Sequence, residues 1–183
     1  RGEVFQSQSD TEVLLKGYGA WGVDVLKRLD GMFALLLFDP VHQQLLIARD
    51  HVGIKPLYYA RTQDGGLAFG SEVRSLMASG LVATDWDTAS FHDYLVYGAI
   101  QEPRTIRKAV RAIPPAHFGV LDVAEFCPFA SSLNPHQYWQ LEPAEQSSVS
   151  GRTTDVSSNS RLLHTEVLQR TLEQQVLADV PVG

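Results

Sequence analysis

The chain has 183 residues, 44% of them hydrophobic and 20% charged, which suits a globular protein with one sizeable domain, or one domain and part of another. A formal net charge of −6 argues against a nucleic-acid partner, which would require clustered lysine and arginine. No apolar run approaches the roughly 18–20 residues of a membrane helix, and the single cysteine, Cys127, excludes an internal disulfide and favours a reducing compartment, here predicted to be the cytoplasm.

Two short helices are predicted near the start of the chain. Ser9 and Glu12 have the spacing of a capping box, in which each side chain accepts a free backbone N–H of the first turn. Glycines weaken the continuation of this helix. We therefore expect a joint near Gly19–Trp21 and a second helix over Val23–Leu29.

Four strands are predicted over the next forty residues. The apolar run Met32–Phe38 is expected to be a strand buried on both faces. Further strands are expected at Gln44–Ala48, Leu57–Ala60 and Leu67–Gly70, the last two joined by the turn Asp64-Gly65-Gly66. Such short connections indicate antiparallel pairing.

A charged loop, Arg49–Lys55, lies between the second and third of these strands. A plain hairpin turn needs only glycine or asparagine, so this charge is unusual. Its residues are candidates for chemistry, but a charged connection between strands is more often structural. Gly53 and Pro56 are then expected to shape the turn.

The following segment mixes helices and short strands. Ser71 is predicted to cap a helix over Glu72–Ala78. Asp87 is predicted to cap another, with Phe91, Tyr94, Leu95 and Gly98 at helical spacing. Short strands are expected at the following positions: Phe118–Leu121 and Gln137–Leu141.

The end of the chain changes in composition. Residues 142–160 are rich in serine, threonine and glycine and are predicted to form a flexible linker. Helical periodicity returns in Arg161–Ala178. The predicted organisation is a first domain over 1–141, this linker, and the beginning of a second domain over 161–183.

Candidate functional residues are few. Nothing near Cys127 would activate a thiol, and the six histidines show no metal-ligand spacing, so no metal site is predicted. No phosphate-binding loop is present. Asp10 is the best candidate for ligand contact, because a rigid carboxylate at a helix start suits the amino group of a small ligand. The alternative is that Asp10 simply stabilises the helix through its dipole.

Several segments together resemble the glutamine-hydrolysing asparagine synthetase family, and specifically its class II glutamine amidotransferase domain. The matching segments, in the order of that family, are Ser9–Leu14, Arg28–Ala34, Arg49–Tyr59, Phe69–Val73, Tyr97–His117 and Asp179–Gly183. Ala116 departs from the family pattern, which usually has glycine there.

The resemblance implies an α+β fold of the N-terminal-nucleophile hydrolase type, here a partial αββα sandwich with antiparallel sheets, followed by a C-terminal helix from a second domain. It also implies that an N-terminal cysteine attacks glutamine and that ammonia then reaches an aspartate activated by ATP and Mg²⁺ in a synthetase domain. Asp10 matches the family position that binds the α-amino group of glutamine.

The catalytic parts of that family have no counterpart in these residues. The first residue is Arg1 rather than cysteine, and no oxyanion-hole or ATP-loop motif occurs. We therefore expect a fragment that lacks both the N-terminal cysteine and the ATP-binding domain, has no catalytic residue, is inactive alone and exposes a sheet edge. Two alternatives stay open, a related amidotransferase acting on another carboxylate, such as a β-lactam synthetase-like or biosynthetic-cluster homologue, and a non-catalytic degenerate homologue. The sequence also leaves a homodimer open.

Overall fold

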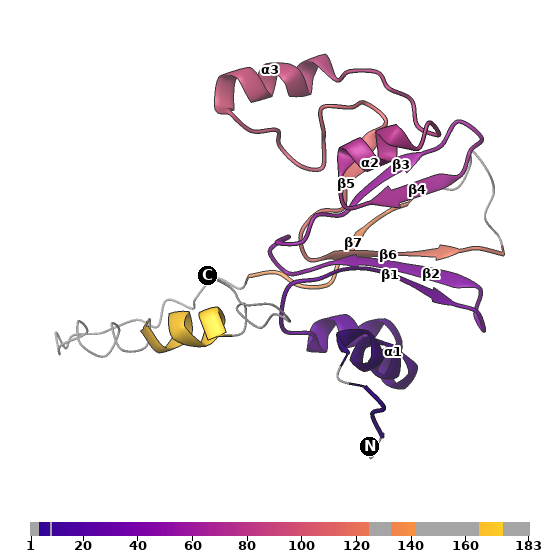
Figure 1. Ribbon diagram of the computed structural model, residues 1–183, viewed down its shortest axis with the longest axis vertical. Coiled ribbons are helices and arrows are strands. Elements are labelled where there is room, and N and C mark those ends of the chain that lie inside the picture. Colours follow the sequence, from indigo (N-terminus) through magenta and orange to yellow (C-terminus); the bar gives the residue numbers. More distant parts are fainter. Residues whose placement is uncertain (1–3, 8, 125–132, 142–164, 174–183) are drawn as a thin grey trace, which may run out of the picture. The chain divides into compact units, whose positions relative to one another are not determined.

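The computed structural model describes residues 4–7, 9–124, 133–141 and 165–173, and the chain divides into two units, Arg1–Gln140 and Leu141–Gly183 (Figure 1). In the second unit, residues 165–173 are helical, within the segment where helical periodicity is predicted. The predicted linker 142–160, Cys127 and the segment 179–183 lie outside the described residues. Within the described part, no helix is both long enough and apolar enough to cross a bilayer.

Two consecutive helices open the first unit, as predicted. The α-helix α1 spans Asp10–Trp21, and a 3₁₀ helix, η1, spans Gly22–Arg28. The side chain of Ser9 accepts a hydrogen bond from the backbone N–H of Thr11 at 3.2 Å, which caps α1. Gly22 ends α1 with a φ of 57°, a conformation that glycine adopts without steric cost.

The strands form two antiparallel sheets. The first has the order β1-β2-β6-β7, and the second has the order β4-β3-β5. The strands of the first sheet are β1 (Ala34–Asp39), β2 (Gln44–Arg49), β6 (His117–Asp122) and β7 (His136–Gln137). Those of the second are β3 (Tyr58–Arg61), β4 (Leu67–Gly70) and β5 (Val110–Ala112). The segment after Arg49 therefore carries the chain from the first sheet to the second.

The apolar run at β1 is not buried on both faces, so that prediction is wrong. Leu35 and Leu37 are buried, whereas Leu36 is 46% exposed and Phe38 is 51% exposed. The reason is that β1 stands at the edge of a four-stranded sheet, while the described part of the facing sheet has only three strands. The expected exposed edge is therefore present at β1.

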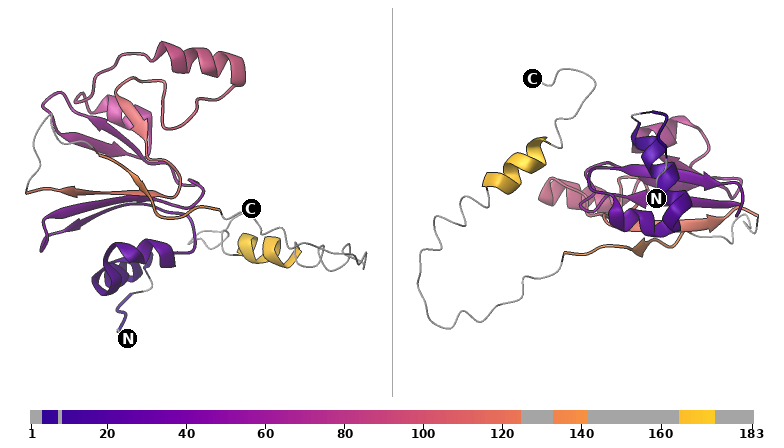
Figure 2. Two further views of the ribbon diagram at one scale, coloured as in Figure 1. Left: turned by 180° about the vertical axis from the view of Figure 1, so that it is seen from behind. Right: turned by 90° about the horizontal axis from the view of Figure 1, so that it is seen from below.

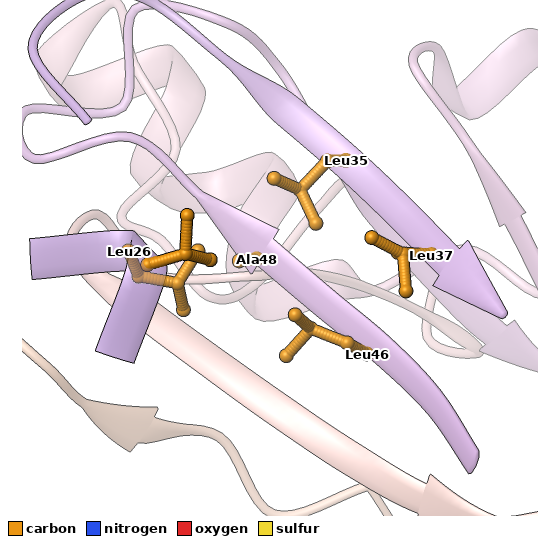
Figure 3. Close-up of a cluster of buried hydrophobic side chains, with 6 residues drawn as sticks. Leu26, Leu35, Leu37, Leu46 and Ala48 are labelled. Carbon is orange, nitrogen blue, oxygen red and sulfur yellow. The ribbon is translucent and has the colours of Figure 1, made fainter. Parts of the chain in front are cut away.

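Three apolar clusters hold the layers together. The first joins η1 to the outer face of the β1-β2 pair (Figure 3). Its members are Val25, Leu26, Leu35, Leu37, Leu46 and Ala48. The second lies between the two sheets and contains Ile47, Leu57, Ile113, Leu121 and Leu133. The third packs α2 (Val73–Ala78) on the second sheet through Ala60, Leu76, Val82 and Val110.

The first unit thus has the layer order helix, sheet, sheet, helix, and Figure 2 shows the same layers from behind. This confirms the predicted α+β αββα fold. Two smaller predictions, a helix cap and a strand, are wrong. Glu72, not Ser71, occupies the N-cap of α2, and its side chain makes no capping bond. The predicted strand Gln137–Leu141 is reduced to the two residues of β7.

The helix α3 (Thr88–Tyr97) follows α2, and Asp87 caps its N-terminus, as predicted. The side chain of Asp87 accepts hydrogen bonds from the N–H groups of Ala89 and Ser90, at 3.1 and 3.3 Å. Gly98 terminates the helix in the left-handed conformation, with a φ of 72°.

Candidate functional site

The first candidate is the start of α1, where Asp10 is the first helical residue. Asp10 is exposed, and within residues 4–7 and 9–124 its carboxylate makes no hydrogen bond or ion pair. Ser9 fixes the helix start beside it. The carboxylate is thus held by backbone geometry and free to meet a cation, which fits the predicted contact with an amino group but equally fits a solvated helix N-terminus.

The predicted capping box does not form. The Ser9 hydroxyl accepts from the N–H of Thr11 rather than from that of Glu12, and the N–H of Ser9 donates to the hydroxyl of Ser7 rather than to the Glu12 carboxylate. Instead, the Glu12 carboxylate accepts hydrogen bonds from the N–H groups of Gln6 and Ser7, at 2.9 and 2.7 Å. It also accepts the hydroxyl of Ser7 at 2.6 Å and pairs with Lys16 at 2.9 Å. These contacts, the Ser7 hydroxyl first and Lys16 next, lower the pKa of Glu12 from 4.5 to about 2. Glu12 therefore anchors the segment before the helix, at Gln6 and Ser7, rather than capping the helix itself.

The Glu12 contacts predict an unusual acid titration. Because the folded-state pKa lies below the ordinary value, their stabilisation is complete above pH 4.5 and is lost as the pH falls through about 2. In NMR spectra, the amide shift of Ser7 should titrate with a midpoint near 2, and Glu12→Gln should remove this titration. A midpoint near 4.5 in the folded protein would contradict these contacts.

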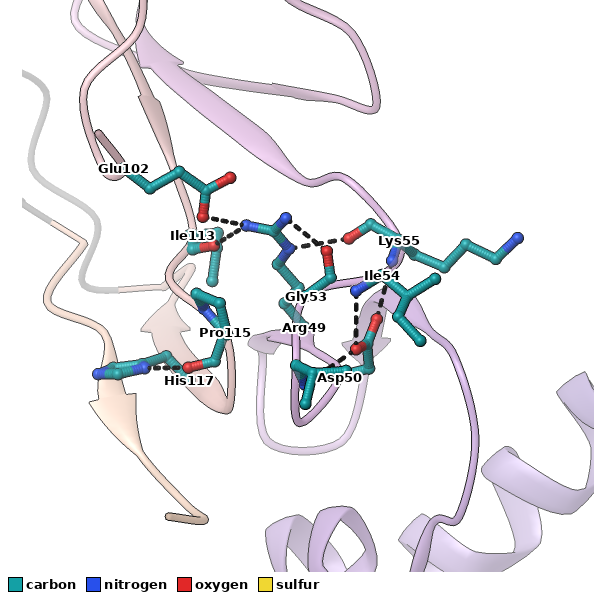
Figure 4. Close-up of polar contacts among 10 residues, drawn as sticks. Arg49, Asp50, Gly53, Ile54, Lys55, Glu102, Ile113, Pro115 and His117 are labelled. Atoms are coloured by element: carbon teal, nitrogen blue, oxygen red, sulfur yellow. Dashed lines mark hydrogen bonds and ion pairs between the residues drawn. The ribbon is translucent and has the colours of Figure 1, made fainter. Parts of the chain in front are cut away.

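The second candidate is the charged loop after β2, which begins with a buried guanidinium (Figure 4). Arg49 is only 5% exposed. Its Nε donates to the carbonyl of Lys55 at 2.8 Å, and its Nη2 donates to that of Gly53 at 2.8 Å. Its Nη1 donates to the Glu102 carboxylate at 2.8 Å and to the carbonyl of Ile113 at 2.7 Å. The guanidinium therefore joins three separate segments of the chain.

The adjacent carboxylate organises the loop itself. Asp50 is 1% exposed and accepts hydrogen bonds from the N–H groups of Val52, Ile54 and Lys55, at 3.2, 3.0 and 2.9 Å. Gly53 has a φ of 71°, and a Cβ there would come within 2.9 Å of Pro115. Both charges are thus used inside the protein, which supports the structural interpretation of the loop.

The backbone carbonyls of Arg49 and Asp50 accept hydrogen bonds from later segments of the first unit. The hydroxyl of Tyr138 donates to the carbonyl of Arg49 at 2.9 Å, and the N–H of Ala116 donates to the carbonyl of Asp50 at 2.8 Å. Burial raises the pKa of Tyr138, so the hydroxyl stays a donor. The centroid of the His51 ring lies 5.4 Å from that of the Tyr138 ring and 5.0 Å from that of the Trp139 ring.

The partners Glu102, Ile113 and Tyr138 were missed by the sequence interpretation. Glu102 lies 53 residues from Arg49 and Tyr138 lies 89 residues from it, so no local spacing connects them. The sequence motif at Arg49–Tyr59 identified the charged loop but not the distant segments that bond to this loop.

The described residues offer no evident metal centre. In residues 4–7, 9–124, 133–141 and 165–173, no group of three or more His, Cys, Asp or Glu side chains is placed to hold an ion. His42 instead bonds to Asp39 at 2.7 Å, and this contact is the main reason that the pKa of Asp39 falls to about 2. His117 bonds to the carbonyl of Pro115 at 2.7 Å.

Comparison with known proteins gives a family match over most of the chain. A family model described as a glutamine amidotransferase domain matches residues 1–139. The chain belongs to the glutamine amidotransferase domain family. The match covers both sheets, α1 and the charged loop, so the geometry above is the geometry of this domain.

The relatives of this amidotransferase domain are much longer proteins. The glutamine-hydrolysing asparagine synthetase 3 of Bacillus subtilis is 31% identical over 183 residues, which cover 100% of this chain and 27% of that protein. A Mycobacterium tuberculosis protein named for the same activity is 33% identical over 185 residues, with the same two shares. The amidase chry2 of Gibberella zeae is 30% identical over 98% of this chain and 25% of its own length. The chain therefore spans about a quarter of the length of these relatives.

Proposed function

We propose that this chain belongs to an ATP-dependent asparagine synthetase that takes ammonia from glutamine and transfers it to an adenylated aspartate. The observation that carries the proposal is the extent of the match. The family model matches residues 1–139, whereas asparagine synthetases align with the whole chain, including the residues after the amidotransferase domain.

In this proposal, the described residues bind and position glutamine. The Asp10 carboxylate would accept hydrogen bonds from the α-ammonium group of glutamine, since it is exposed, lies at a fixed helix start and bonds to no other described residue. Among the described residues, no group of three or more His, Cys, Asp or Glu side chains is placed to hold a metal ion. In this proposal, ATP, Mg²⁺ and aspartate are bound by the synthetase region of the parent protein.

A charge-removing substitution tests the proposed role of Asp10. In the full-length enzyme, Asp10→Asn should raise KM for glutamine by about 10–100-fold, because a hydrogen bond to a charged group contributes about 1.5–3 kcal/mol. The matched control is Asp24→Asn, which changes an exposed aspartate in η1 and should leave KM unchanged. Equal KM values for the Asp10 variant and the wild type would remove Asp10 from the site.

The isolated 183-residue chain should release no glutamate from glutamine. The mechanism that the family resemblance implies requires an N-terminal cysteine, whose α-amino group acts as the base. The single cysteine of these 183 residues, Cys127, is internal and so has no free α-amino group. The measurement is glutamate release by the isolated chain and by the full-length protein under the same conditions. Turnover by the isolated chain would contradict the assignment of the nucleophile to another part of the parent protein.

A second function is favoured by the fungal relatives. The amidases chry2 of Gibberella zeae and chyE of Penicillium rubens are 30% and 32% identical over 98% of the chain. An amidotransferase acting on a carboxylate other than aspartate is therefore the alternative. Aspartate-dependent AMP release by the full-length protein would favour the synthetase, and AMP release only with another carboxylic acid would favour the alternative. Glutamine binding without any turnover would indicate a non-catalytic homologue.

A further inference from the structure

The C-terminal turn of α3 is apolar and exposed on every side. It consists of Tyr94, Leu95, Val96 and Tyr97, here called the α3 tip. Exposure of these side chains runs from 53% at Tyr94 to 72% at Tyr97. Because successive residues of an α-helix are turned by about 100°, four consecutive apolar residues point in all directions. No single contact on one side of the helix could cover them.

The helix gains little from the cores of its own domain. No residue of α3 belongs to any of the three buried clusters among the described residues, and the one buried residue of the helix is Ser90. A ten-residue helix is marginal in water without tertiary packing, and a helix that is apolar all round is normally buried. The α3 tip therefore has the composition of an interface.

Polar contacts hold α3 in place despite this lack of burial. The segments on either side of it are joined by two backbone hydrogen bonds of 3.0 Å, from Asp87 to Ile106 and from Lys108 to Asp85. The guanidinium of Arg107 lies 4.1 Å from the ring centroid of Trp86. Arg104 pairs with Asp93 on the helix itself. Figure 1 shows the resulting arm, which extends from the second sheet with α3 at its end.

We propose that the α3 tip docks against the synthetase region of the parent polypeptide. This inference rests on the proposed function, since it takes its partner from there. The relatives that align with the entire chain, α3 included, have about three quarters of their length outside the match. An intramolecular partner is present at high effective concentration, which makes docking of a small apolar surface favourable. The tyrosines suit such a contact, because each combines a large apolar ring with a hydroxyl.

A second copy of this chain is the less favoured occupant. The chain has a net charge of −6, so two copies repel each other at long range. A dimer contact would also have to enclose all four sides of the α3 tip from two identical short helices. A larger region of the same polypeptide can surround the helix end without either cost.

Hydrogen exchange tests the docking. Amides of α3 should exchange at least about tenfold more slowly in the full-length polypeptide than in the isolated 183-residue chain, at a concentration where sedimentation shows only monomers. Leu95→Glu in the full-length protein should abolish the difference. The control Val41→Glu, at a residue 83% exposed outside α3, should keep it. Equal rates in the two proteins, or slowing that appears only as the concentration rises, would overturn the inference.

A second variant and a second assay keep the outcome interpretable. If Leu95→Glu loses the protection of the β1 and β2 amides, and so has failed to fold, Tyr97→Gln replaces it, because Tyr97 is the most exposed residue of the tip. Asparagine formation is measured on the same full-length sample. Protection of α3 without asparagine formation would refute the proposed function but keep the docking, whereas asparagine formation without protection would refute the docking alone.

Discussion

Replacing Arg49 with methionine is expected to lower the free energy of unfolding of the first unit by about 3–5 kcal/mol. Methionine fills a similar volume but donates no hydrogen bond. The carbonyls of Gly53, Lys55 and Ile113 would each lose a donor, and Glu102 would lose its counter-charge. Because Arg49 joins the loop to two distant segments, the loss should also reduce cooperativity between the two sheets. The measurement is urea denaturation followed by tryptophan fluorescence.

An exposed ion pair of the same chemistry provides the control. Arg74 pairs with Glu72 on the surface, and Arg74→Met should leave the denaturation midpoint almost unchanged. Arg49→Lys should recover only part of the loss, since lysine cannot reproduce the planar set of donors that meets four acceptors. If Arg49→Met and Arg74→Met behaved alike, the buried network would not be a main source of stability.

Local sequence signals predicted the elements of this domain well. The caps Ser9 and Asp87, and the glycine turn before β4, act on neighbouring residues. A few consecutive residues are therefore enough to predict them. What the sequence did not reveal is the partition of the strands. The β1-β2 and β3-β4 pairs are both antiparallel with short connections, yet they belong to different sheets. Where the chain crosses between the sheets, Arg49 contacts residues more than fifty positions away, which no local signal reports.

Burial was harder to predict than secondary structure. The apolar run of β1 looks like a core strand, and Phe91, Tyr94 and Leu95 look like the inner face of a packed helix. In both cases the residues have helical or strand spacing, but Phe38 and Leu95 are exposed because the described part of the first unit provides no layer to cover them. Spacing reports which side chains share a face, whereas burial depends on what lies opposite. Asp10 shows the same limit, since its place at the helix start follows from sequence but its ligand does not.

The Asp50→Asn substitution is expected to lower the free energy of unfolding by about 1.5–3 kcal/mol, although it changes a single atom of a buried side chain. An aspartate offers two accepting oxygens, and here one accepts from Val52 and Ile54 while the other accepts from Lys55. Asparagine must place an NH₂ group at one of these positions, so a backbone N–H would face another donor. The network loses both its charge and one acceptor.

The same change should loosen the passage between the sheets. The carbonyl of Asp50 accepts from the N–H of Ala116, and its own N–H donates to the carbonyl of Phe33, so movement of the loop reaches the starts of β6 and β1 in the first sheet. Thermal unfolding should therefore shift together with the amide exchange of Ile54 and Lys55. Asp85→Asn, at an exposed aspartate whose side chain takes no part in the loop, is the matched control and should be neutral. If Asp50→Asn kept the wild-type melting temperature, the carboxylate would be replaceable by any acceptor, and the charge of this motif would need a role outside the fold.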